Sequence, residues 1–306
     1  GKIGNKIMAE KTIKVAEIFY SVQGEGIFAG VPSVFIRTFG CNFECRGFGL
    51  PEGQATGEPE RIASIVKAQR EAGKEVSYDL LPLANSGCDS YASWHKDFKD
   101  LSPKMTLDEI VETTMHHVDS QRLFRDASGT NHEMPHIIIT GGEPLLGWQR
   151  AYPELIDKFY DLGFREFTFE TNGTQKLSAD LKDYLLTNAI KNKKINLTFS
   201  VSAKLPCSGE LWEQAIVPEV VCEYEKYGNA YLKLVVANEQ DVMDANAAVT
   251  EYQNAGFTGP VYLMPSGGTN EEYDLTAPQV ANLCMEYGYR YSPRLQVDLF
   301  KNAWGT

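Results

Sequence analysis

The chain has 306 residues, enough for one large domain or two small ones with a sizeable apolar core. Its Asp and Glu residues total 41 against 29 Lys and Arg, a formal net charge of −12. This acidic balance argues against non-specific binding to nucleic acid or to an anionic membrane, because both attract basic surfaces. The sequence also has no apolar run of the length that a membrane-spanning helix requires.

Residues 1–10 carry two early lysines but no apolar stretch, so they do not read as a secretory signal. We expect this N-terminus to be flexible or derived from an expression vector, with Met8 as the natural start. The chain is then expected in the reducing cytoplasm. Its six cysteines should serve there as thiols or metal ligands rather than as disulfides.

Predicted strands and helices alternate along most of the chain. Runs rich in β-branched and aromatic residues predict strands at 33–38, 136–140, 166–170, 196–201, 231–236, 261–264 and 295–299. Amphipathic stretches predict helices at 58–72, 106–118, 152–162, 179–186, 209–227, 240–255 and 278–287. This alternation indicates parallel βαβ units, and the unbroken apolar strands indicate a sheet covered on both faces. About six such units are typical of an open barrel or a doubly wound sheet.

The segment 46–87 departs from this alternation and is rich in Gly, Pro and Glu. A structureless loop of this length is uncommon in a compact domain, so we expect it to have local structure. We interpret it as an insertion folded over the surface, or as a lid, within a single domain spanning 1–306.

Cys41 and Cys45 directly follow the predicted strand at 33–38. An iron–sulfur cluster needs several thiolates on one face, and a close pair of cysteines supplies two of them. Two small buried residues at a strand end explain the pair alone equally well. Cys207, Cys222 and Cys284 are isolated, as ordinary core or surface thiols are.

Glycine-rich and polar motifs end four of the later strands. They read TGGEP at 140–144, ETNGT at 170–174, SVSAK at 200–204 and MPSG at 264–267. Paired glycines let a backbone approach a ligand closely, and a glutamate can pair with an ammonium group. Because the carboxyl ends of parallel strands meet at one edge, these motifs predict an active site there.

Three stretches resemble a family of radical S-adenosylmethionine (SAM) enzymes, the 7-carboxy-7-deazaguanine synthases. They read FYSVQGEG at 19–26, GVPSVFIR at 30–37 followed by Gly40-Cys41, and CDSYASW at 88–94. The resemblance implies an α/β fold, a partial (open) TIM-like (β/α)6 radical SAM barrel. It also implies a large insertion, 46–87, between the second and third cluster cysteines. Phe48 stands where the common spacing would put the third cysteine.

The resemblance implies a [4Fe–4S] cluster on Cys41, Cys45 and Cys88, with SAM chelated by the open iron. It implies Mg²⁺ at Ser90, where the family has threonine. The implied SAM-binding residues are Gly142, Glu143, Glu170, Asn172, Ser202, Ala203, Lys204, Met264, Pro265, Ser266 and Gly267. The implied substrate-binding residues are Val22, Gln23, Gly24, Glu25, Arg37, Thr140 and Thr306, with Arg37 gripping a carboxylate.

The implied reaction converts 6-carboxy-5,6,7,8-tetrahydropterin to 7-carboxy-7-deazaguanine with loss of ammonia, which is the work of a carbon–nitrogen lyase. A 5′-deoxyadenosyl radical made from SAM abstracts hydrogen from C6 of the pterin, the ring contracts, and SAM is regenerated. The product would feed the synthesis of queuosine in tRNA or of modified bases in DNA. A flavodoxin or ferredoxin is the implied electron donor, and a homodimer is the implied assembly.

Two alternatives stay open. A protein that activates glycyl-radical enzymes is also a radical SAM protein, but the uninterrupted Cys-x3-Cys-x2-Cys spacing expected of it is broken at Phe48. A non-catalytic zinc-binding interaction protein would hold the metal with Cys41, Cys45, Cys88 and a histidine such as His95. That alternative leaves the TGGEP strand end unexplained.

Overall fold

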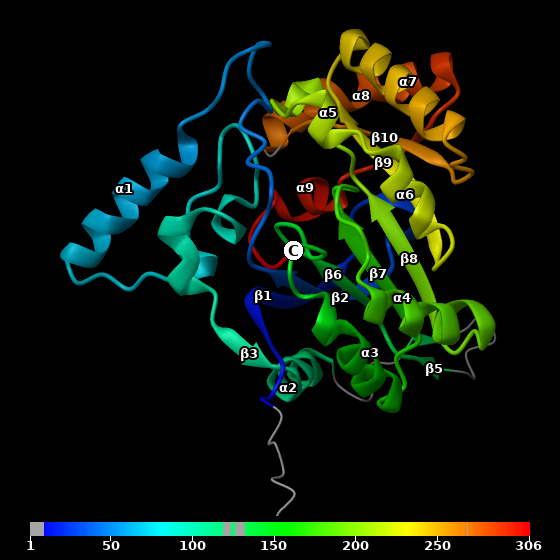
Figure 1. Ribbon diagram of the computed structural model, residues 1–306. Coiled ribbons are helices and arrows are strands. Elements are labelled where there is room, and N and C mark those ends of the chain that lie inside the picture. The colour runs from blue at the N-terminus through cyan, green and yellow to red at the C-terminus, as the bar shows by residue number, and fades with distance from the viewer. Residues whose placement is uncertain (1–8, 119–123, 126–131, 268) are drawn as a thin grey trace, which may run out of the picture.

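An open sheet of nine strands organises the computed structural model, which describes residues 9–118, 124–125, 132–267 and 269–306 (Figure 1). The strand order is β11-β10-β9-β8-β7-β6-β2-β1-β3, and β4 and β5 form a separate pair. Their bounds are β1 (Thr12–Val22), β2 (Pro32–Thr38), β3 (Lys104–Thr106), β4 (Phe124–Arg125), β5 (His132–Glu133), β6 (His136–Thr140), β7 (Glu166–Thr171), β8 (Asn196–Val201), β9 (Asn229–Val236), β10 (Val261–Pro265) and β11 (Arg290–Tyr291). The predicted mixed α/β class is confirmed. The expectation about residues 1–10 is not tested for residues 1–8, because these lie outside the described residues.

Strands β2 and β6 to β11 run parallel to one another, whereas β1 is antiparallel to both β2 and β3. Parallel neighbours need a crossover connection, which helices supply between successive strands. All the parallel strands therefore end at the same edge of the sheet. That edge is where the motifs that follow β6, β7, β8 and β10 lie.

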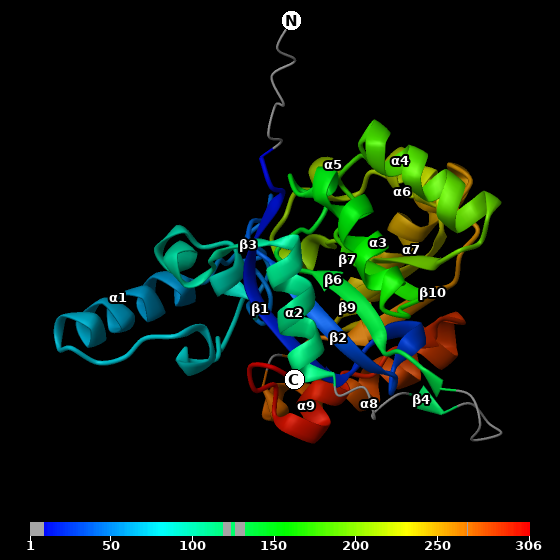
Figure 2. The ribbon, with the colours of Figure 1, turned by 90° about the horizontal axis from the view of Figure 1, so that it is seen from below.

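The α-helices lie mainly between these strands in the chain and flank the sheet (Figure 2). They are α1 (Glu58–Glu71), α2 (Leu107–His117), α3 (Tyr152–Asp161), α4 (Ala179–Leu185), α5 (Trp212–Ala215), α6 (Pro218–Tyr224), α7 (Glu239–Asn254), α8 (Asn270–Tyr287) and α9 (Leu295–Phe300). The shorter helical turns are η1 (Gly26–Phe28), η2 (Tyr78–Leu80), η3 (Tyr91–Ser93), η4 (Lys96–Leu101), η5 (Gln149–Ala151), η6 (Leu186–Lys191) and η7 (Pro206–Ser208). No helix among the described residues combines the length and the apolar character needed to cross a membrane.

Local signals explain several helix boundaries. At the start of α2, Thr106 and Glu109 form a capping box, in which each side chain bonds the other's backbone N–H. The predicted helix at 209–227 is divided instead into α5 and α6. Gly209 adopts a left-handed conformation with φ of 87°, and Pro218 starts a new helix at its first position.

The predicted strand at 295–299 is wrong, because these residues form the helix α9. Leu295, Val297 and Leu299 alternate as in a strand, but over five residues the same spacing also fits one helical turn. Only Val297 of the three is buried. Strand β1 was not predicted; it pairs along the length of β2, the strand that precedes the loop with Cys41 and Cys45.

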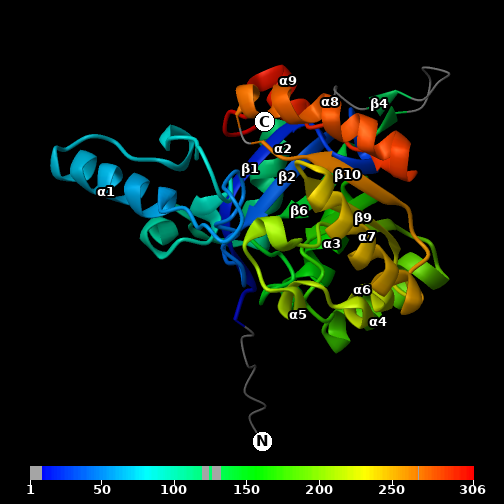
Figure 3. The same cartoon turned by 90° about the horizontal axis from the view of Figure 1, so that it is seen from above.

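The segment 46–87 contains α1 and η2 and stands out from the sheet on the side of β1 and β3 (Figure 3). The predicted helix at 58–72 is confirmed, one residue shorter. Its apolar face contributes Ile62 and Val66 to a small second core with Tyr91 and Phe98. Trp304, near the C-terminus, packs against this core and donates a hydrogen bond from Nε1 to the Leu81 carbonyl at 2.7 Å. Burial of one face of α1 thus stabilises the local structure of this segment.

The main core lies between the sheet and its helices and includes a buried polar pair. His136 on β6 is 2% exposed and its Nε2 lies 2.7 Å from Thr168 Oγ1 on β7. Burial lowers the pKa of His136 from 6.5 to about 4, because a charged imidazole would lose its hydration.

This shift predicts acid sensitivity. Because the folded-state pKa is depressed, the stability that His136 contributes is present above pH 6.5 and is lost as pH falls through about 4. At about 1.4 kcal/mol per pKa unit, the loss is on the order of 3 kcal/mol. The variant His136→Gln has no such titration. Urea unfolding followed by circular dichroism should show the wild-type advantage shrinking between pH 6.5 and 4, and a constant difference would contradict this account.

Candidate functional site

A cavity of about 280 Å³ opens at the carboxyl edge of the parallel strands, next to the loop after β2 and the C-terminal tail. Nineteen residues that the sequence singled out line it. They are Val22, Gln23, Gly24, Glu25, Arg37, Cys41, Cys45, Cys88, Ser90, Thr140, Gly142, Glu170, Asn172, Ser202, Lys204, Met264, Ser266, Gly267 and Thr306. Glu143, Ala203 and Pro265 are buried and are not among the lining residues. The rule that parallel strands carry their sites at this edge thus locates the cavity.

The glycine pair after β6 brings the strand end against the cysteine-bearing loop. A Cβ atom on Gly142 would lie 2.1 Å from the Gly40 carbonyl oxygen, so only glycine fits there. The Gly142 N–H donates to Ser93 Oγ at 2.8 Å, and the Glu143 N–H donates to the Gly40 carbonyl at 2.7 Å. Three segments distant in the sequence are joined in this way beside the cavity.

Glu143 braces the strand ends from behind the cavity wall. Its carboxylate accepts hydrogen bonds from the backbone N–H groups of Asn172 (2.7 Å, on Oε1) and Leu145 (3.0 Å, on Oε2), and from the Thr171 hydroxyl. Burial raises its pKa to about 7, although these donors oppose the shift. The resemblance implies that Glu143 binds SAM, and this stays a prediction; in the structure its buried carboxylate accepts hydrogen bonds from two backbone N–H groups and from the Thr171 hydroxyl.

We therefore expect Glu143→Gln to destabilise the fold. Both carboxylate oxygens face backbone N–H donors, so an amide must point its own NH2 at one of them. Leaving a buried donor unpaired costs roughly 1–3 kcal/mol. Chemical denaturation at pH 8 should show this loss, with the exposed Glu71→Gln on α1 as the matched control. Equal stability of the two variants would show that the carboxylate does not brace the strands.

The three candidate cluster cysteines face the same cavity from different parts of the chain. Cys41 and Cys45 lie in the loop after β2, and Cys88 follows the segment 46–87. Burial raises the pKa of all three thiols, that of Cys41 to about 12, and each thiol is within electrostatic reach of another member of the set. Lys204 opposes the shift at all three. Its ammonium group is therefore placed to offset negative charge on these sulfurs.

The loop that carries Cys45 is clamped by the turn after β8. The Glu210 carboxylate accepts the backbone N–H groups of Glu44 at 3.0 Å and Cys45 at 2.9 Å. Cys45 itself adopts a left-handed conformation with φ of 49°, which costs a non-glycine residue energy. Sequence reasoning missed Glu210, because nothing in its neighbourhood marks a contact 165 residues away.

Arg37, at the end of β2, spreads its guanidinium across the cavity wall. Its Nε donates to Glu17 Oε2 at 3.1 Å, and its Nη1 donates to the Gly141 carbonyl at 2.7 Å and to Ser90 Oγ at 3.2 Å. These bonds fix the plane of the fork and hold it beside the cavity. Glu17 belongs to β1 and was missed with that strand.

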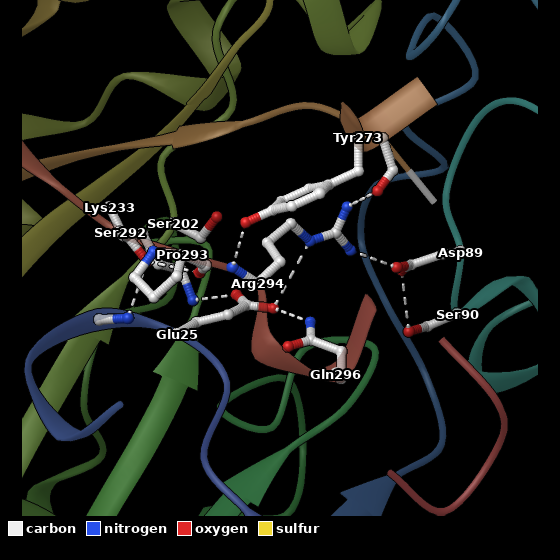
Figure 4. A network of polar contacts seen from close by, with 12 residues as sticks. Glu25, Asp89, Ser90, Ser202, Lys233, Tyr273, Ser292, Pro293, Arg294 and Gln296 are labelled. Carbon is white, nitrogen blue, oxygen red and sulfur yellow. Dashed lines mark hydrogen bonds and ion pairs between the residues drawn. The ribbon is translucent and has the colours of Figure 1, made fainter. Parts of the chain in front are cut away.

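A network of charged side chains also lines the cavity (Figure 4). Glu25 accepts from Lys233 Nζ at 2.7 Å and from Gln296 Nε2 at 2.6 Å, and Arg294 Nε lies 3.9 Å from the same carboxylate. Arg294 also pairs with Asp89 at 2.8 Å, next to Cys88. Burial alone would raise the pKa of Glu25, but Lys233 and Arg294 lower it to about 2. Glu25 is therefore a fixed, ionised acceptor.

Lys233 was also missed by the sequence analysis, although a signal was present. It stands in the middle of the apolar run of β9, and a lysine there is costly unless it is paired. A lysine within a buried strand therefore indicates that a polar cavity lies beside the strand at that position.

No group of three or more His, Cys, Asp or Glu side chains within the described parts of the chain is arranged to hold a single metal ion. His95, the histidine of the zinc alternative, is buried; its Nδ1 accepts from the Asp97 N–H, and it does not line the cavity. A tetrahedral site needs its ligands to converge on one ion. The geometry therefore disfavours the zinc alternative.

The chain is similar to curated proteins named 7-carboxy-7-deazaguanine synthase. The relative from Halobacterium salinarum is 28% identical over 95% of this chain and 91% of its own length. The relative from Pyrobaculum aerophilum is 26% identical over 97% of this chain and 99% of its own. The crystal structure of QueE from Escherichia coli superimposes with a TM-score of 0.52 at 18% identity, covering 92% of this chain and 93% of that one.

No family model matches the chain. The relatives nevertheless extend over nearly the whole chain, which confirms the resemblance predicted from three short motifs. The structural likeness agrees with the open α/β sheet.

Proposed function

We propose that this chain is a 7-carboxy-7-deazaguanine synthase, which converts 6-carboxy-5,6,7,8-tetrahydropterin to 7-carboxy-7-deazaguanine with loss of ammonia. The observation that carries the proposal is the shared cavity. Three cysteines, an arginine fork and an ionised glutamate face it together, although the sequence motifs that predicted them are far apart. Relatives of that name align over more than nine-tenths of the chain.

The donor set suits an iron–sulfur cluster better than a single ion. A [4Fe–4S] cluster spreads its thiolates over separate irons, so Cys41, Cys45 and Cys88 need to surround a cavity rather than converge on one point. The three thiols do line one cavity, with Lys204 beside them. We propose that they hold the cluster, and thiol protons would leave as iron binds. When bound, the cluster supplies the electron for reductive cleavage of SAM.

The residues of this chain would then orient both organic molecules. We assign the substrate carboxylate to Arg37, through the Nη2 group that Glu17, Ser90 and the Gly141 carbonyl do not engage, since a guanidinium pairs well with carboxylates. Glu25, held as an acceptor, would take N–H donors from the pterin edge. Thr140 and the C-terminal residue Thr306 line the same space. SAM would lie along Gly142, Asn172, Ser202 and Ser266, at the ends of β6, β7, β8 and β10.

Magnesium fits the structure less readily. Ser90 Oγ accepts from the Arg37 guanidinium at 3.2 Å, and the neighbouring Asp89 is paired with Arg294. A Mg²⁺ ion prefers oxygen ligands and water rather than adjacent cations. The protein alone therefore supplies few free oxygens to a metal ion at Ser90.

The resemblance also supports proposals about the chain's setting. A flavodoxin or ferredoxin would deliver the electron, the active unit would be a homodimer, and six free cysteines suit the reducing cytoplasm. We propose further that 1–306 is a single domain and that 46–87 is an insertion. The product would enter 7-deazapurine synthesis for tRNA or DNA.

An anaerobic assay tests the proposal. The protein is reconstituted with iron and sulfide and given SAM, a reductant, Mg²⁺ and the pterin. We expect 7-carboxy-7-deazaguanine to form only when the cluster, SAM, the reductant and the pterin are all present. The assay is run with and without Mg²⁺ to measure the effect of the ion separately. SAM cleavage without any deazaguanine product would favour the alternative of an activating protein for glycyl-radical enzymes.

A further inference from the structure

One buried lysine, Lys233, contacts two of the carboxylates that line the cavity. Lys233 on β9 is 4% exposed and lies between apolar strand neighbours. Its ammonium nitrogen is 2.7 Å from Glu25 Oε1 and 3.6 Å from Glu170 Oε2. A buried ammonium is stable only when its charge is balanced, and here two carboxylates balance it. Their attraction raises the pKa of Lys233 in spite of burial, so the group stays charged.

The two carboxylates come from different sides of the site. Glu25 lies in the loop after β1, and Glu170 lies at the end of β7 beside Asn172. Under the proposed function, Glu25 meets the pterin. Glu170 is one of the SAM-binding residues that the resemblance implies, and we assign to it the ribose hydroxyls of SAM, since a carboxylate accepts hydrogen bonds from hydroxyl groups. The Lys233 ammonium thus contacts both the carboxylate assigned to the pterin, Glu25, and the carboxylate assigned to SAM, Glu170.

The partners of Glu25 are divided between its two oxygens (Figure 4). Oε2 receives the Gln296 amide and faces Arg294, both from the segment before and within α9. Oε1 receives Lys233. The position of Oε1 therefore depends on how strongly the ammonium is drawn to Glu170 instead.

We propose that Lys233 is a positioning residue that couples SAM binding to pterin binding, an inference that rests on the proposed function. When ribose hydroxyls donate to Glu170, that carboxylate competes less for the ammonium. Lys233 then pairs more fully with Glu25 and fixes its orientation for the pterin. By reciprocity, bound pterin strengthens SAM binding by the same factor.

Equilibrium binding tests this coupling without turnover. The dissociation constant of carboxytetrahydropterin is measured on the reconstituted, oxidised protein, with and without saturating SAM. Allosteric couplings are typically about 5–150-fold, and we expect the wild type to bind pterin at least about 5-fold tighter with SAM present. In Lys233→Met that ratio should fall to about 1. Iron content should be unchanged.

Two further variants keep the test sharp. Lys158→Met is the matched control, because Lys158 pairs with Asp108 at 2.8 Å on the helical surface and should leave the coupling intact. Lys233→Met/Glu25→Gln removes one charge of each sign, so it avoids an unbalanced buried carboxylate. It should fold even where Lys233→Met does not, and should also lack the coupling.

The outcomes separate this inference from the proposed function. A wild type that binds SAM and pterin and forms product, yet shows no coupling, overturns the role of Lys233 alone. The same holds if Lys233→Met, or the double variant, retains the wild-type ratio. A wild type that neither binds nor converts the pterin overturns the proposed function, and this inference with it.

Discussion

Cys88→Ala is expected to leave the reconstituted protein without a stable cluster and to lower pterin turnover by roughly 100-fold or more. Changes to groups that only support metal ligands cost about 10–100-fold, so loss of a ligand should exceed that range. The reason is the ligand count: Cys41 and Cys45 alone cannot hold three irons. Iron and sulfide per chain, visible absorbance and product formation measure the effect.

The matched control is Cys222→Ala. Cys222 lies on α6, outside the cavity lining, and its thiol points at the Tyr252 carbonyl. This variant should keep full iron and full activity. An intact cluster that still cleaves SAM in Cys88→Ala would mean that the third ligand lies elsewhere, and comparable iron loss in both variants would point to general instability.

Six of the parallel strands could be predicted because each is a short apolar run bounded by turn residues, whereas β11, of only two residues, was missed. The six runs from 33–38 to 261–264 all became strands, with ends shifted by at most two residues. Strand β1 escaped notice because its register shifts between Val15 and Glu17, and that irregularity breaks the alternation of buried and exposed side chains. Helix α9 was mistaken for a strand because Leu295 and Leu299 alternate with polar residues while packing decides otherwise.

The residues of the candidate site also fall into two groups, those that the sequence predicts and those that it does not. Residues in compact motifs, such as Gly142 or Cys88, could be predicted because the motif carries its own local chemistry. Lys233 and Glu210 could not, because their partners are Glu25 and the loop of Cys45, 208 and 165 residues away. Contacts of that range are set by the order of strands in the sheet. A single sequence does not state that order, although the buried lysine on β9 does mark a polar wall.

Arg37→Lys is expected to raise the KM for the pterin by roughly 10–150-fold, because hydrogen bonds to charged groups contribute about 1.5–3 kcal/mol. Lysine keeps the charge but not the planar fork, which Glu17, Ser90 and the Gly141 carbonyl hold in place. The KM for SAM should change little, since this residue is assigned to the substrate carboxylate alone. Steady-state kinetics with each substrate varied in turn would measure both.

Stability must be separated from binding in this test, because Arg37 also balances Glu17 inside the fold. Arg37→Met/Glu17→Gln removes both charges and should fold while binding pterin as poorly as Arg37→Lys or worse. The control for the loss of a guanidinium in general is Arg165→Lys. The Arg165 guanidinium lies 3.7 Å from the centre of the Tyr160 ring and does not line the cavity. A pterin KM within twofold of wild type in Arg37→Lys would move the carboxylate site to another cation. Lys204, which donates to Ser202 Oγ at 3.2 Å beside the cysteines, would be the first to examine.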